Sequence, residues 1–167
     1  PPLVTRQYLA KSLERTHHWA KICLQSKNYP NALFGIVQGS RFRDFRERSA
    51  KYLNGLGFDG FGIGGDLGKD KKEMDKILKW TMPHLDENKP RHLLGIGYLE
   101  DMPQIIKNGV DLFDCIVPTH YARRGVAFTS AGKLDLQKSK FLNDKKPLDP
   151  KCGCSVCGNY RRNYICH

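Results

Sequence analysis

The sequence predicts an α/β fold in which short parallel strands alternate with helices. Two features indicate this fold. The strand-like segments, such as residues 32–37, are short and almost continuously apolar, and helical segments separate them. Strands that are buried on both faces have this composition, which is typical of parallel sheets covered by helices. Hydrophobic residues make up 40% of the 167 residues, which is enough to form a core.

The alternation begins with an amphipathic helix at residues 5–26, in which Leu9, Leu13 and Trp19 lie on or near one face. Three more helices and four strands follow. The expected strands are 32–37, 61–63, 93–97 and 110–117, and the expected helices between them are 41–56, 69–82 and 99–107.

Small or polar residues lie at or near the end of each expected strand. They are Gln38-Gly39, Gly64-Gly65, Gly95 with Gly97, and Asp114. In a β/α barrel the carboxyl ends of the strands form the active face, and a doubly wound sheet binds ligands at the same edge. The pattern alone leaves both architectures open, although four βα units equal half of an eightfold barrel.

Asp114 is the sharpest candidate for catalysis, because it lies in the apolar segment 112–117. Burial of an unpaired carboxylate is costly, so such a residue needs a reason. It would serve as a nucleophile or acid/base, or as a structural residue that caps a turn or pairs with an arginine. Asp111 and Asp59 precede or begin strands and are expected to be caps.

Gln38, Gly64 and Gly65 are candidates for binding a flat heterocycle. Glycine lets a ligand approach the backbone closely, and a glutamine amide offers both a donor and an acceptor. The alternative is that they form only tight βα turns. The glycine-rich segment 62–68 lacks the Lys and Ser/Thr of a phosphate-binding loop.

The chain is strongly basic, with a formal net charge of +11 and a pI of about 9.5. Such a surplus favours a polyanionic partner, usually nucleic acid, although it also promotes solubility. Arg123 and Arg124 open a basic stretch in which Lys138 and Lys140 also lie. We expect no membrane span, because no apolar run approaches about 20 residues, and no secretion signal is seen at the start.

Cys152, Cys154 and Cys157 form a C-x-C-x2-C cluster, which predicts a structural zinc site. The fourth ligand would be Cys166, His167 or a residue outside the chain. The remaining cysteines are isolated, so we expect a reduced cytoplasmic protein and not a disulfide framework.

Several segments, in order and at similar separations, together resemble the tRNA-guanine transglycosylases, also called queuine tRNA-ribosyltransferases. They span nearly the whole chain. The matching segments are 34–39, 57–60 through 63–65, 89–97, 113–119 and 147–157.

The resemblance implies the C-terminal half of a (β/α)8 TIM barrel with a zinc-binding insertion. Residues 1–122 would supply four βα units, and 123–167 a truncated basic zinc-binding appendage. Such enzymes exchange the wobble guanine of a tRNA anticodon loop for a 7-deazaguanine through a covalent Asp-ribosyl intermediate. The resemblance implies that Asp114 is the nucleophile. It also implies that the base is bound by Gln38, Gly64, Gly65, Leu94 and Gly95, and that the tRNA backbone is bound by Arg123, Arg124, Lys138 and Lys140.

The chain departs from the family pattern in ways that shape these expectations. The family's second catalytic carboxylate lies in an N-terminal half that is absent here, and its fourth zinc ligand lies about 25 residues after the third cysteine. Asp66 replaces the leucine that is usual in bacterial members, and it would favour a cationic aminomethyl group or mark a different 7-substituent. We therefore expect these 167 residues to be inactive alone and the full-length protein to form homodimers or heterodimers. The alternatives are a non-catalytic subunit that pairs with a catalytic partner, and a zinc module that only binds RNA.

Overall fold

The structure is a computed structural model that describes residues 5–167. The chain divides after Cys115 into two compact units, 1–115 and 116–167. The first unit contains a sheet with its covering helices, and the second contains a hairpin and short helices. Each is described by itself.

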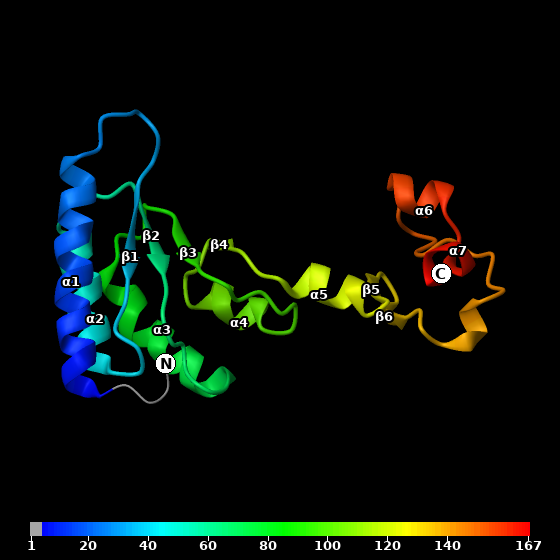
Figure 1. Ribbon diagram of the computed structural model, residues 1–167, viewed down its shortest axis with the longest axis horizontal. Coiled ribbons are helices and arrows are strands. Elements are labelled where there is room, and N and C mark those ends of the chain that lie inside the picture. The colour runs from blue at the N-terminus through cyan, green and yellow to red at the C-terminus, as the bar shows by residue number, and fades with distance from the viewer. Residues whose placement is uncertain (1–4) are drawn as a thin grey trace. The chain divides into compact units, whose positions relative to one another are not determined.

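The first unit is built on a four-stranded parallel sheet (Figure 1). Its strands lie in the order β1-β2-β3-β4, so each strand pairs with its neighbour in the sequence. This confirms the α/β class with parallel strands. The strands are β1 (Phe34–Val37), β2 (Gly60–Ile63), β3 (Arg91–Leu93) and β4 (Leu112–Phe113).

Helices connect the strands, as the sequence predicts. The first helix, expected at residues 5–26, is confirmed at Arg6–Gln25. It begins at Arg6 because the Thr5 hydroxyl caps it by accepting a hydrogen bond from the Tyr8 N–H. Asp70 caps α3 in the same way, by accepting from the Glu73 N–H. The helices of this unit are α1 (Arg6–Gln25), α2 (Arg43–Asn54), α3 (Lys71–Thr81), the 3-10 turn η1 (Met82–His84) and α4 (Met102–Lys107).

The last two strands differ from the prediction. β3 covers Arg91–Leu93 and not residues 93–97, because the chain leaves the sheet at Leu94 and turns at Gly95, whose φ is 73°. β4 has two residues, and Val117 begins helix α5 (Val117–Arg123) instead of ending a strand. Pro118 fits that first turn because its missing N–H needs no partner there.

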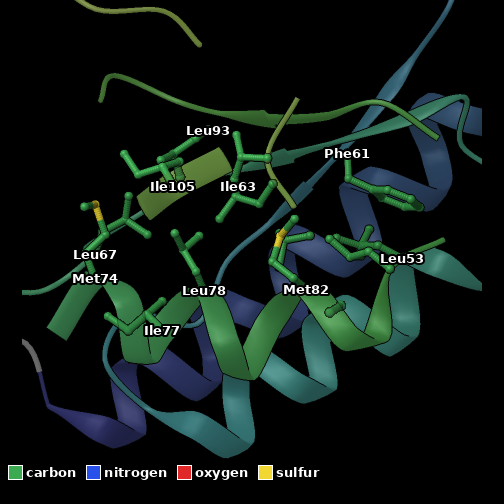
Figure 2. Close-up of a cluster of buried hydrophobic side chains, with 14 of the residues drawn as sticks. Leu53, Phe61, Ile63, Leu67, Met74, Ile77, Leu78, Met82, Leu93 and Ile105 are labelled. Atoms are coloured by element: carbon green, nitrogen blue, oxygen red, sulfur yellow. The ribbon is translucent and has the colours of Figure 1, made fainter. Parts of the chain in front are cut away.

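The core lies between the sheet and the helices α2, α3 and α4 (Figure 2). Ile63 and Leu93 project from neighbouring strands, and Leu78 of α3 and Ile105 of α4 pack in the same cluster. All four side chains are fully buried. Burial of each such side chain stabilises the fold by roughly 1.5–3 kcal/mol.

The second unit begins with α5 and continues into an antiparallel hairpin. Strands β5 (Val126–Thr129) and β6 (Gly132–Asp135) pair around Ser130 and Ala131. Short helices follow: η2 (Ser139–Phe141), α6 (Ser155–Asn159) and α7 (Arg162–Cys166). Across residues 5–167, none of the helices has the length and apolar character needed to cross a bilayer.

The carboxylate of Asp75 links α3 to α4, and its contacts predict how the stability of the fold depends on acid pH. Asp75 accepts hydrogen bonds from Lys79 at 2.6 Å, Gln104 at 2.7 Å and Asn108 at 2.8 Å. The Lys79 contact, followed by that from Asn108, lowers the pKa of Asp75 to about 2. Because the folded pKa lies below the unfolded value, this stabilisation is complete above about pH 4 and is lost as the pH falls towards 2.

We expect Asp75→Asn to lower the free energy of unfolding at pH 7, with the difference from wild type shrinking as the pH falls below about 4. Urea unfolding at several pH values measures this. Glu87→Gln is the control, since Glu87 is an exposed carboxylate outside this link. A penalty for Asp75→Asn that stays the same between pH 7 and pH 2 would contradict the assignment.

Candidate functional site

The residues expected to bind a base and to attack a sugar converge at the carboxyl edge of the sheet. Gln38 follows β1, Gly64 and Gly65 follow β2, Leu94 follows β3, and Asp114 follows β4. Atoms of the Gln38 carboxamide and Leu94 Cδ1 lie next to Gly64, where an added Cβ would meet them at 3.0 and 3.3 Å. The parallel arrangement explains this convergence, because all four strands end at one edge.

Asp114 is held at this edge by the strand beside it. Its Oδ1 accepts a hydrogen bond from the Gly95 N–H at 3.1 Å, and His92 Nε2 lies 2.9 Å from the same oxygen. His92 Nε2 is buried and has no hydrogen-bond partner among residues 5–167, so this short contact is not a hydrogen bond. The side chain of Asp114 is 58% exposed, so the expectation of a buried carboxylate was wrong.

The sequence pattern did not single out His92. The register of the folded sheet explains its position. His92 pairs with Leu112 across the β3–β4 ladder. Since side chains two residues apart on a strand face the same side, Asp114 follows Leu112 onto the face that His92 shares.

A pocket of about 420 Å³ adjoins the ends of β1 and β2. Its volume falls in the range typical of small-molecule sites. One wall is the first half of α1. The residues of the strand ends that line it are Gln38, Gly39, Ser40, Gly65 and Asp66.

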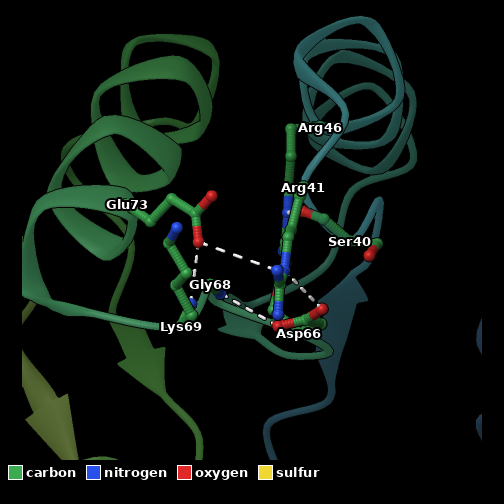
Figure 3. A network of polar contacts seen from close by, with 7 residues as sticks. All are labelled: Ser40, Arg41, Arg46, Asp66, Gly68, Lys69 and Glu73. Atoms are coloured by element: carbon green, nitrogen blue, oxygen red, sulfur yellow. Dashed lines mark hydrogen bonds and ion pairs between the residues drawn. The ribbon is translucent and has the colours of Figure 1, made fainter. Parts of the chain in front are cut away.

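Arg46 of α2 forms hydrogen bonds with both loops that line this pocket, the loop after β1 and the loop after β2 (Figure 3). It donates hydrogen bonds to the backbone carbonyls of Ser40 at 2.7 Å, and of Gly64 and Asp66 at 2.8 Å each. Its side chain is fully buried, and this burial lowers the pKa of Arg46 to about 10, which the charge of Asp66 partly opposes. Nothing in the sequence pattern distinguished Arg46 from the other basic residues of α2.

The carboxylate of Asp66 is already paired. It accepts from Arg41 Nε at 2.8 Å and from the Gly68 N–H at 2.9 Å (Figure 3). Partial burial opposes its ionisation, but these two hydrogen bonds outweigh burial and keep the pKa of Asp66 below its ordinary value. The charge of the Asp66 carboxylate is therefore matched by contacts within the protein.

Three cysteines of the second unit form a group that could hold a metal ion. The sulfur atoms of Cys152, Cys154 and Cys157 all lie within 4.8 Å of one another. Thiolates bound to one tetrahedral zinc lie about 3.8 Å apart, so this cluster fits such an ion after a small contraction. Hydrogen bonds from the Cys157 N–H and then from neighbouring thiols lower the pKa of Cys154 to about 7, which favours the thiolate.

Neither Cys166 nor His167 belongs to this group. The Cys166 thiol instead donates to the Leu136 carbonyl at 2.9 Å. The structure therefore brings together three of the ligands expected from the sequence.

The basic residues expected to contact RNA lie on the surface of the second unit. Arg123 ends α5, and Arg124 caps it. Lys138 and Lys140 lie at the start of and within η2. All four side chains are exposed, so they are accessible to a polyanion.

The first unit therefore defines a parallel α/β protein with a carboxylate and a pocket at its carboxyl edge. A family model described as queuine tRNA-ribosyltransferase matches residues 1–167, and the chain belongs to this family. It is 46% identical over 162 residues to the queuine tRNA-ribosyltransferase of Halothermothrix orenii, and 44% identical over 171 residues to that of Bacillus cytotoxicus. These alignments cover 96% and 100% of the chain but only 43% and 45% of the relatives.

Gly65, which lies beside Gln38, generates a prediction about the shape of this edge. Gly65 and Gly57 both have a left-handed backbone, with φ of 80° and 83°. An added Cβ has open space at Gly57 but would collide with Gln38 Oε1 at Gly65. We expect Gly65→Ala and Gly57→Ala to lose about 1–2 kcal/mol each through backbone strain, whereas only Gly65→Ala displaces the Gln38 carboxamide.

Thermal unfolding measures the two costs, and the side-chain amide resonances of Gln38 report its position. The idea fails if those resonances stay unchanged in Gly65→Ala, or if they move equally in Gly57→Ala.

Proposed function

We propose that this chain carries the nucleophile and part of the base site of a tRNA-guanine transglycosylase. The enzyme would exchange the wobble guanine of a tRNA anticodon loop for a 7-deazaguanine. The observation that carries the proposal is the arrangement of Asp114, which is exposed and oriented by the Gly95 N–H next to the edge formed by Gln38 and Gly64.

Asp114 would attack the anomeric carbon of the ribose. The bond from that carbon to guanine N9 breaks, and the bonding electrons leave with the base, which takes up a proton. The product is a covalent ribosyl ester, which the incoming base then displaces. Two inversions give net retention, the same logic as in a retaining glycosidase.

The contacts of Asp114 distinguish its two oxygens. Oδ1 is occupied by the Gly95 N–H and adjoins His92. Among residues 5–167, Oδ2 accepts no hydrogen bond, so it is the oxygen available for attack. A nucleophile fixed by one oxygen loses less entropy on reaching the transition state.

Gln38, Gly64 and Gly65 would bind the edge of the base, with Leu94 and Gly95 at its flank. Gln38 offers a donor and an acceptor, and the two glycines allow the base to approach the backbone. The target base must leave its stack, which is less costly in an anticodon loop than in a duplex.

We also propose that the sheet is half of a (β/α)8 barrel. Residues 1–122 would supply four βα units, and residues 123–167 the appendage. Two features support this. β1 and β4 are the edge strands of the sheet, and a pocket of about 450 Å³ with an apolar lining runs along β1 beside Trp19. Further strands pairing with both edges would close the barrel.

In the appendage, Cys152, Cys154 and Cys157 would hold a structural zinc. Bound zinc would cross-link the loop at Cys152 to the first turn of α6. Arg123, Arg124, Lys138 and Lys140 would neutralise tRNA phosphates. The other expected partners are a 7-deazaguanine or guanine base and a second subunit, in a homodimer or heterodimer, and the expected compartment is the cytoplasm.

A non-catalytic subunit is the weaker reading. Such a subunit has no need of a nucleophile, whereas here Asp114 is present, exposed and oriented. A stand-alone RNA-binding zinc module is weaker still, since the ordered sheet and the pocket at its edge would have no purpose in it.

Replacing the nucleophile tests the proposal. In the full-length protein, we expect Asp114→Asn to slow formation of the covalent adduct with anticodon stem-loop RNA by at least about a thousandfold, because an amide oxygen is a poor nucleophile. Denaturing gels that retain the RNA–protein adduct measure this. Asp111→Asn is the matched control, since Asp111 pairs with Arg91 at the start of the strand. Adduct formation by Asp114→Asn at the wild-type rate would refute the assignment.

The metal assignment makes a separate prediction. We expect one zinc per chain, lost in Cys154→Ser and retained in the double variant Cys166→Ser, His167→Ala, because the Cys166 thiol is bonded to Leu136. Elemental analysis of the purified proteins gives the stoichiometry. Loss of zinc from the double variant would show that the end of the chain supplies a ligand.

A further inference from the structure

We propose that Arg46 is a positioning residue that turns the Gly65 N–H towards the base, an inference that rests on the proposed function. Arg46 itself reaches the pocket only through the loops that it binds. Its role would be to fix which backbone groups those loops present.

The geometry begins with the carbonyls that Arg46 engages. Three nitrogens of its guanidinium each donate to a different backbone oxygen, those of Ser40, Gly64 and Asp66. Ser40 belongs to the loop after β1, and the other two belong to the loop after β2. A single planar group therefore fixes both loops, and its rigid fork suits it to this task better than the flexible ammonium of lysine.

The consequence follows from the planarity of the peptide bond. In a trans peptide the carbonyl of one residue and the N–H of the next point in opposite directions. Because the Gly64 carbonyl points at Arg46, the Gly65 N–H points away from it. Gly65 lines the pocket, and among residues 5–167 its N–H donates to no protein acceptor.

The burial of Arg46 strengthens this argument. A fully buried cation is costly, and none of its three hydrogen bonds goes to a carboxylate. Asp66 contributes its carbonyl here, while its carboxylate pairs with Arg41. The arrangement costs folding energy and yields a backbone donor that is fixed before the ligand arrives, which is the usual benefit of preorganisation.

The ligand feature that such a donor recognises is a carbonyl acceptor on the edge of the base. In guanine the strongest such acceptor is O6, and 2-aminopurine lacks it. The wild-type enzyme should therefore bind guanine more tightly than 2-aminopurine, and part of that preference should depend on Arg46.

The test uses the full-length protein. The probes are the KM for labelled guanine in exchange into tRNA and the inhibition constant of 2-aminopurine in the same assay. We expect Arg46→Lys to reduce the preference for guanine over 2-aminopurine by about tenfold, roughly the value of one oriented hydrogen bond. Arg43→Lys is the matched control, because Arg43 lies on the same helix and pairs with Glu47 at the surface.

Arg46→Gln serves as a second variant, and cooperative thermal unfolding establishes that each variant is folded. A folded variant that keeps the wild-type preference would overturn the inference, as would an equal loss in Arg43→Lys. If neither Arg46 variant folds, Arg46 is a structural residue and the inference falls. If the wild-type protein does not exchange guanine, the proposed function fails instead, so the two failures are distinguishable.

Discussion

The common direction of the four strands is the constraint on which the first unit depends. Each strand pairs with its neighbour in the sequence, and all four run parallel. The carboxyl ends of the strands must therefore meet at one edge, although up to 76 residues of sequence separate the groups that gather there, from Gln38 to Asp114. The helices cover the sheet and supply its core, whereas a parallel sheet offers its carboxyl edge for ligand binding.

Much of this arrangement is predictable because local patterns and the topology agree. Residues such as Leu13, Leu53 and Leu78 are apolar at helical spacing and are buried as that spacing requires. The fourth strand was harder, because an apolar run from Val110 to Val117 fits a strand and gives no sign that pairing stops at Phe113. Where a parallel strand ends depends on its neighbour, and β3 is itself only three residues long.

The site was only partly predictable, because some of its residues matter only through contacts that form on folding. Asp114, Gln38 and Gly65 stand out because they interrupt or follow apolar runs. His92 and Arg46 do not stand out, since a histidine in a strand and an arginine in a basic helix are both ordinary. Their importance arises from contacts with residues 22 and 18 positions away, Asp114 and Gly64, and such contacts exist only in the folded sheet.

The charged groups of Asp114 and Arg46 differ in their exposure to solvent and in their hydrogen-bond partners. At Asp114 the carboxylate is 58% exposed and accepts one backbone N–H, so it stays accessible to a ligand. The guanidinium of Arg46 is buried, and its three nitrogens donate to three backbone carbonyls, so it does not contact a ligand directly. A reactive charge has to remain accessible, whereas a charge that only shapes the backbone works best where water cannot compete for its hydrogen bonds. Under the proposed function, this partition between an exposed anion and a buried cation would let Asp114 react while Arg46 orients the backbone that reads the substrate.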